Sequence, residues 1–136
     1  MTIQRFEEGL LDTSVFIASE SGRALDADRL PQRGYVSVVT AAELEAGIHA
    51  AATPEIRAQR LLTYQAVMRL ELLPIDRQVS HHWATLRYRV ANAGHRANIN
   101  DLWIAATALA RKIPVVTQDD DFAVLAALGV LEIIHV

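Results

Sequence analysis

Four carboxylates in this sequence have the spacing of a possible site for a divalent metal ion. Each lies at the end of an apolar run or at the start of a segment with helical character: Asp12, Glu43, Asp101 and Asp119. Carboxylate oxygens, without His or Cys, are the ligands preferred by Mg²⁺ and Mn²⁺, which keep several bound waters for a substrate phosphate. The pattern therefore favours metal-assisted hydrolysis of a phosphodiester.

The predicted positions of these acids explain how they could meet. Asp12 ends a predicted strand, and Asp119 comes two residues after the strand that ends at Thr117. In an open parallel sheet, ligands bind at the carboxyl ends of the strands. Four carboxylates gathered there would repel one another by about 3 kcal/mol per pair at ~5 Å and an effective dielectric near ~20. Such a cluster needs a bound cation or shared protons.

Each acid also has a purely structural interpretation. Thr40 and Glu43 match the S/T-x-x-E capping box at a helix start, and Asp101 stands in the first turn of another predicted helix. The run DDD at 119–121 is, by itself, typical of a solvated turn. It is the combination of four acids at one expected sheet edge that favours a site.

Apolar runs and helical patterns alternate along the chain. Strands are predicted near residues 9–12, 34–40, 72–76, 113–117 and 130–136. Helices are predicted after Asp12 and over residues 40–51, 54–72, 77–93, 100–112 and 120–129. This alternation predicts an α/β three-layer sandwich in which helices flank a central, mostly parallel sheet.

The bulk composition sets further limits. A chain of 136 residues with 51% hydrophobic residues predicts one globular domain over residues 1–136. The net charge of −3 excludes a bulk-electrostatic nucleic-acid binder, and the absence of cysteine excludes disulfides and zinc–thiolate sites. The first residues lack the pattern of a signal peptide and no run is long enough to span a membrane, so we expect a cytoplasmic protein.

The four acidic segments together resemble a known family. LLDTSVFI, SVVTAAELEAG, INDLWIAATAL and VVTQDDDF look like the four acidic motifs of PIN-domain ribonucleases, and more narrowly of the VapC toxins of toxin–antitoxin modules. The resemblance spans nearly the whole chain in the right order. It implies a PIN fold and a Mg²⁺- or Mn²⁺-dependent endoribonuclease that cleaves tRNA or rRNA. It also implies a cognate VapB-type antitoxin that blocks the site, and a homodimer.

Residue by residue, the resemblance assigns catalytic roles to Asp12, Glu43, Asp101 and Asp119. The metal ligands among them would be Asp12, Asp101 and Asp119, with Glu43 completing the shell directly or through water. Ser14 and Thr117 match hydroxyl-bearing positions that support such sites.

The fourth acid follows the pattern T-x-D, which selects Asp119 in TQDDD. The departure from the family's pattern is the crowding by two further acids. We expect Asp120 to be solvated and Asp121 to cap a helix starting at Phe122, with ligation of metal through water as the alternative for Asp121.

Substrate binding must come from other side chains. Arg87, Arg89 and Arg96 flank the apolar stripe and the end of the helix predicted at 77–93, where they could meet RNA phosphates or simply be solvated. Trp83 lies on that stripe and is expected in the core. Trp103 follows Asp101 closely, and could stack a base or make a core or dimer contact.

Three other interpretations remain open on the sequence. A non-cleaving PIN-like module that binds RNA or a partner would keep the fold, although its acids would typically be eroded. The same chemistry could act on single-stranded or flap DNA, but no additional domain for such a substrate is evident. A phospho-acceptor receiver domain would need adjacent acids after its first strand and a Lys after a late strand, and the single Lys, Lys112, precedes IPVVT.

Overall fold

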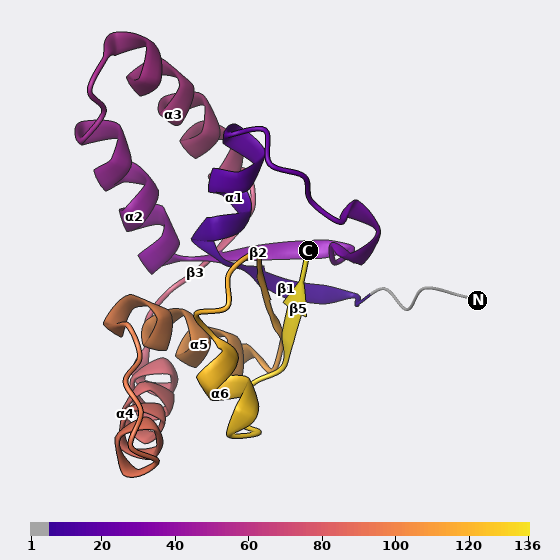
Figure 1. Cartoon of the computed structure of the whole chain (residues 1–136), viewed down its shortest axis with the longest axis vertical. Helices are drawn as coiled ribbons and strands as arrows, with labels where there is room; N and C mark the ends of the chain where they lie inside the picture. The colour runs from indigo at the N-terminus through magenta and orange to yellow at the C-terminus, as the bar shows by residue number, and fades with distance from the viewer. Residues whose placement is uncertain (1–5) are drawn as a thin grey trace.

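The structure, a computed structural model, describes residues 6–136 and centres on one five-stranded parallel sheet (Figure 1). Residues 1–5 lie outside the described residues, and the prediction that the first residues do not form a signal peptide falls partly on them. The sheet order is β3-β2-β1-β4-β5, and every neighbouring pair is parallel. The strands are β1 (Glu8–Leu11), β2 (Arg33–Ser37), β3 (Glu71–Leu73), β4 (Val115–Thr117) and β5 (Ile133–His135).

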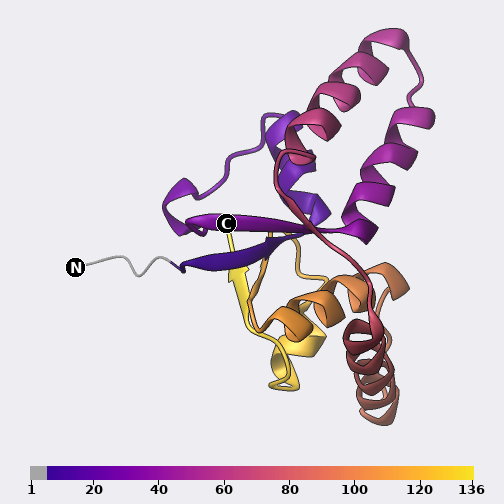
Figure 2. The ribbon, with the colours of Figure 1, turned by 180° about the vertical axis from the view of Figure 1, so that it is seen from behind.

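Helices cover the sheet on both sides, so the predicted three-layer α/β sandwich is confirmed (Figures 1 and 2). One layer holds α1 (Thr13–Glu20), α2 (Val38–His49) and α3 (Pro54–Val67). The other holds α4 (Arg77–Asn92), α5 (Ile99–Arg111) and α6 (Ala123–Ala127), and a short 3₁₀ turn, η1 (Ala27–Arg29), precedes β2. No helix within residues 6–136 has the length and apolar character needed to cross a membrane.

Two apolar clusters follow from the alternation of side chains along the strands. Leu10 and Val115 are fully buried on the face that packs against α4, α5 and α6. Their neighbours Leu11 and Val116 point to the opposite face, where Val116 packs with Val15 of α1. The α2–α3 pair contributes little to either cluster, because Thr40 and Val67 are the buried residues of these two helices. This pair therefore stands away from the sheet (Figure 1).

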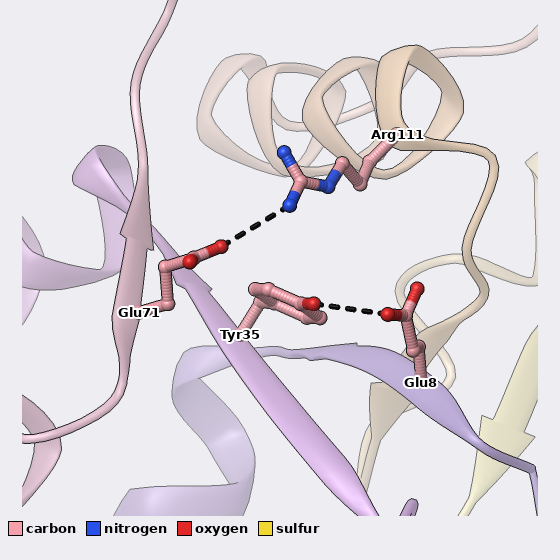
Figure 3. A network of polar contacts seen from close by, with 4 residues as sticks. All are labelled: Glu8, Tyr35, Glu71 and Arg111. Carbon is pink, nitrogen blue, oxygen red and sulfur yellow. Dashed lines mark hydrogen bonds and ion pairs between the residues drawn. The ribbon is translucent and has the colours of Figure 1, made fainter.

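Polar contacts secure the edge of the sheet where the strands begin (Figure 3). The Tyr35 hydroxyl donates to Oε1 of Glu8 at 3.0 Å, and Arg111 forms an ion pair with Glu71 at 3.2 Å. The Arg111 guanidinium also lies 5.2 Å from the centre of the Tyr35 ring. An exposed ion pair of this kind contributes at most about 1 kcal/mol. Asp12 and Asp119 lie beyond the opposite ends of the strands, after β1 and β4.

Three local predictions were wrong, and two of them concern helix starts. The third is the helix predicted over residues 54–72, which ends at Val67 and is followed by β3 from Glu71. Residues 38–40, predicted as strand, form the first turn of α2, because the Ser37 hydroxyl accepts a hydrogen bond from the Thr40 N–H and caps the helix. Thr40 is therefore inside the helix and does not form a capping box with Glu43. Likewise, α6 begins at Ala123 after Phe122, without a side-chain cap, so Asp121 does not cap it.

Candidate active site

Asp12 occupies the junction between β1 and α1 and is 5% exposed. Its Oδ2 accepts hydrogen bonds from the Ser14 hydroxyl at 2.7 Å and the Thr117 hydroxyl at 3.0 Å, and a longer one from the Ser14 N–H. No group in the described part of the chain donates to Oδ1. The carboxylate is thus held by one oxygen and presents the other.

The two hydroxyls that hold Asp12 also anchor the start of the DDD run. The Gln118 N–H donates to the Ser14 hydroxyl, and the Asp119 N–H donates to the Thr117 hydroxyl, each at 3.0 Å. Each hydroxyl therefore accepts one hydrogen bond from a backbone N–H after β4 and donates one to Asp12. These hydrogen bonds explain why the loop that carries Asp119 is fixed beside Asp12.

Glu43 lies in α2 with its side chain directed towards α1. The Thr13 hydroxyl is 2.8 Å from Oε1 of Glu43 and 3.0 Å from the hydroxyl of Thr40. Because Thr13 has one hydroxyl proton, it donates to one acceptor at a time, and the shorter contact to a charged carboxylate is the stronger. Because Ser37 caps α2, Glu43 has no capping role, and its carboxylate can contribute to the site.

Asp101 lies in the first turn of α5, which the side chain of Asn98 caps by accepting from the N–H groups of Asn100 and Asp101. Burial raises the pKa of Asp101 from 3.8 to about 7. Four further negative charges contribute to this rise in pKa, in the order Asp12, Asp121, Glu43 and Asp119. The other predicted acids are therefore close enough to Asp101 to oppose its ionisation.

The three acids of the DDD run are placed differently. Burial, followed by the charge of Asp121, raises the pKa of Asp119, whereas the nearby Arg23 lowers it. Asp120 is exposed, as predicted, and its carbonyl accepts the N–H of Ala123. Asp121 acts more strongly than Asp119 on the pKa of Asp101. The charge of Asp121, although exposed, thus acts on both Asp101 and Asp119.

The donor set fits a hard divalent cation. Asp12, Asp121, Glu43 and Asp119 lie close enough to Asp101 to act on its pKa, although within residues 6–136 no group of three or more His, Asp or Glu side chains is placed to hold an ion by itself. Mg²⁺ commonly uses one or two carboxylates and keeps several waters, so it does not require such a group. The Oδ1 of Asp12, which accepts no hydrogen bond from the described residues, and the carboxyl of Asp101 are the candidate ligands.

Several residues near the acids were not identified from sequence. Thr13 positions Glu43, and its place between Asp12 and Ser14 was the available signal. Arg23 comes from the loop after α1 and carried no signal in the sequence pattern. A cavity of about 440 Å³ opens beside Thr13 and Glu43, between α1, α2 and α3, with Ile17 and Ile56 among its walls.

The predicted RNA-binding arginines do not act as one group. Arg87 and Arg96 line a second cavity, between α4 and α5. Arg89 turns towards α6 and donates to the carbonyl of Leu128 at 3.4 Å.

A parallel α/β sandwich with acids at the carboxyl ends of its strands is the arrangement expected for PIN-domain ribonucleases. Residues 9–128 match the PIN domain family. The chain is 56% identical to Ribonuclease VapC5 of Mycobacterium tuberculosis, over 94% of this chain and 95% of that protein. It is 48% identical to Ribonuclease VapC4 of the same organism, over 91% of this chain and 95% of that protein.

Solved structures agree with this relationship. The crystal structure of VapBC-5 from M. tuberculosis, a member of the VapBC family of toxin–antitoxin systems, superposes with a TM-score of 0.89 at 52% identity. The match covers 96% of this chain and 99% of that chain. The chain belongs to the PIN-domain family and, within it, to the VapC ribonucleases, the endoribonuclease toxins of type II toxin–antitoxin modules. The predicted family is therefore confirmed.

Proposed function

We propose that this VapC ribonuclease hydrolyses RNA phosphodiesters with Mg²⁺ or Mn²⁺ held by Asp12, Asp101 and Asp119, with Glu43 completing the site. The observation that supports this most strongly is the rise of the Asp101 pKa to about 7, caused first by burial and then by the charges of the other acids of the cluster. Carboxylates that oppose one another's ionisation are the arrangement that a divalent cation stabilises.

Each side chain has a distinct task. Ser14 and Thr117 hold Oδ2 of Asp12, which leaves Oδ1 directed away from the hydroxyls as a donor. Thr13 fixes the carboxylate of Glu43, which accepts a proton from, or orients, the attacking water. When bound, the metal lowers the pKa of water and stabilises charge on the transferring phosphoryl group. Attack in line leaves a 3′-hydroxyl and a 5′-phosphate.

The biological setting follows the family. The substrate is tRNA or rRNA, whose cleavage inhibits translation, and a cognate VapB-type antitoxin is the partner that neutralises the toxin. The cavity beside Glu43 and the exposed Ile17 at its wall offer the antitoxin an apolar surface next to the acids. We further propose that the chain is cytoplasmic and forms a homodimer.

The proposal is tested by incubating the purified toxin with matched RNA and DNA strands in Mn²⁺, with and without EDTA. Cleavage confined to RNA, lost in EDTA and lost in Asp101→Asn supports it. Asp101→Asn is the preferred variant because Asp101 accepts none of the hydrogen bonds that hold Asp12 in place. EDTA-resistant cleavage, or full activity of a well-folded Asp101→Asn toxin, would contradict it.

The alternative is a PIN-like module that binds RNA or a partner without cutting. Such a module would bind the RNA strand with the same affinity in EDTA and in Mn²⁺ and leave it intact. The presence of all four acids at one sheet edge favours the enzyme.

A further inference from the structure

A cavity of about 310 Å³ lies between the carboxyl-terminal half of α4 and the start of α5, separate from the acids. Its polar walls are Arg87, His95 and Arg96, and no acidic residue of the described chain lines it. Its apolar walls include Ile99 and Leu102. The cavity is thus a local basic site on a chain whose net charge is −3.

One of these cations is held in place by an aromatic platform. The Arg87 guanidinium lies 5.4 Å from the centre of the Trp83 ring. Trp83 in turn stacks on Trp103 of α5, with ring centres 4.8 Å apart and planes 18° apart. A cation over an aromatic face is stabilised in that position, and the exposed guanidinium keeps its donors available. The tryptophan pair therefore presents Arg87 at the cavity and links it to the helix that carries Asp101.

The cavity also lies close to the acids along α5. Ile99 is the first residue of this helix and is 54% exposed, and Leu102 follows Asp101 directly. All three belong to the first turn, because an α-helix has about 3.6 residues per turn. A strand whose phosphodiester lies at Asp101 therefore needs only to pass around the start of α5 to reach the cavity.

We propose that this cavity binds a nucleotide of the substrate RNA that flanks the cleaved bond. Arg87 and Arg96 hold its phosphate, and the base lies against Ile99 and Leu102. Arg suits this task because its planar fork binds phosphate oxygens in pairs. This inference rests on the proposed ribonuclease activity and assigns that activity a substrate-binding subsite outside the acidic cluster.

A second copy of the chain fits this cavity less well than RNA. In a two-fold dimer centred here, Arg87 and Arg96 of one protomer would face the same cations of the other. Such like charges brought together at an interface are unfavourable. RNA phosphates, by contrast, neutralise them.

The chain supplies a matched control on the same helix. Arg89 is also exposed and has the same charge as Arg87, but it is directed to the carbonyl of Leu128 and not to the cavity. A general loss of positive charge would affect Arg87→Ala and Arg89→Ala equally. A subsite would distinguish them.

The test measures binding of a short fluorescein-labelled single-stranded RNA of mixed sequence to the full-length toxin in EDTA, by anisotropy over a range of salt. We expect Arg87→Ala and Arg96→Ala each to weaken binding severalfold and to lower the salt slope by about one phosphate contact. Arg89→Ala should bind like wild type. Ile99→Ser should weaken binding without changing the salt slope, because it removes an apolar contact.

Cleavage in Mn²⁺ separates this inference from the proposed function. Arg87→Ala should raise the KM for RNA and leave kcat near that of wild type, whereas Asp101→Asn loses kcat. One result would overturn the subsite and leave the proposed nuclease activity standing. In it, only Asp101→Asn loses cleavage, and Arg87→Ala and Arg96→Ala bind RNA as tightly as Arg89→Ala. The subsite is also overturned if these two variants lose affinity for the antitoxin, or change the oligomeric state by light scattering, while RNA binding stays unchanged.

Discussion

The Thr117 hydroxyl donates a hydrogen bond of 3.0 Å to Oδ2 of Asp12, which lies 105 positions earlier in the sequence. The same hydroxyl accepts the N–H of Asp119 at 3.0 Å. One side chain at the end of β4 therefore fixes both the acid after β1 and the loop that carries the next acid. The geometry of the site depends on this contact as much as on the acids themselves.

Replacing Thr117 with Val should damage both the fold and the site. The variant keeps the shape of the side chain but leaves a buried carboxylate oxygen and a backbone N–H with one partner fewer, at a cost of about 1–3 kcal/mol. We expect a lower midpoint of urea unfolding and RNA cleavage reduced at least about tenfold, in line with losses at groups that position catalytic residues. Thr117→Ser retains the hydroxyl and should stay near wild type in both assays.

Thr13→Val should impair cleavage through Glu43. Without the 2.8 Å hydrogen bond, the Glu43 carboxylate is no longer held towards α1. We expect kcat for RNA to fall by about tenfold or more, with little change in KM, because positioning of a reacting group is lost and not substrate binding. Thr13→Ser is the matched control, and equal kcat values for the Val and Ser variants would contradict the positioning role.

The three consecutive acids should differ in a defined order when each is changed to Asn. Asp119→Asn should abolish cleavage, and Asp121→Asn should reduce it partially. Asp120→Asn should have no effect, because the charges that raise the Asp101 pKa include Asp121 and Asp119 but not Asp120. NMR titration of the Asp101 carboxyl supplies a second measurement. Its pKa should fall further in Asp121→Asn than in Asp119→Asn, because Asp121 contributes more to the rise of the Asp101 pKa.

The metal-free protein should become less stable as the pH rises from about 4 to about 7. The Asp101 carboxyl has a pKa of about 7 in the folded chain and 3.8 ordinarily, so the folded state binds its proton more tightly than the unfolded state over this interval. Loss of that proton therefore costs stability. Asp101→Asn should remove this contribution and be more stable than wild type at about pH 8, by on the order of 1 kcal/mol after discounting for solvent screening. Urea unfolding in EDTA at several pH values measures it, and a variant less stable than wild type at high pH would contradict it.

Divalent metal should reverse the destabilisation of the wild-type protein at neutral pH. A ligand that binds only the folded state stabilises it by about 2.7 kcal/mol at about one hundred times its Kd. We expect Mn²⁺ to raise the Tm of wild type and to have a much smaller effect on Asp101→Asn. Ca²⁺, which prefers more ligands at longer distances, serves as the comparison ion. An equal rise of Tm in both proteins would place the metal elsewhere.

The fold class and the four acids at the carboxyl ends of the strands were predictable from the order of residues along the chain. Apolar runs that alternate with helical segments specify buried parallel strands. The carboxyl ends of parallel strands lie on the same side of the sheet, so Asp12 and Asp119 were predictable as neighbours. The order of the motifs was sufficient to identify the family.

The interactions that these residues make were not predictable in this way and are seen in the folded chain. Glu43 matched a capping box in the local sequence, but the helix is capped by Ser37. The carboxylate of Glu43 instead accepts a hydrogen bond from Thr13, which lies 30 positions earlier in the sequence. Arg87 and Arg89 could not be distinguished in the sequence. In the structure, Arg89 donates to the carbonyl of Leu128 after α6, whereas Arg87 lies over the Trp83 ring. Local patterns specify elements because backbone geometry and side-chain periodicity act over a few residues. The hydrogen-bond partner of a single side chain depends on how elements that are distant in sequence pack together. This packing is determined by the whole chain.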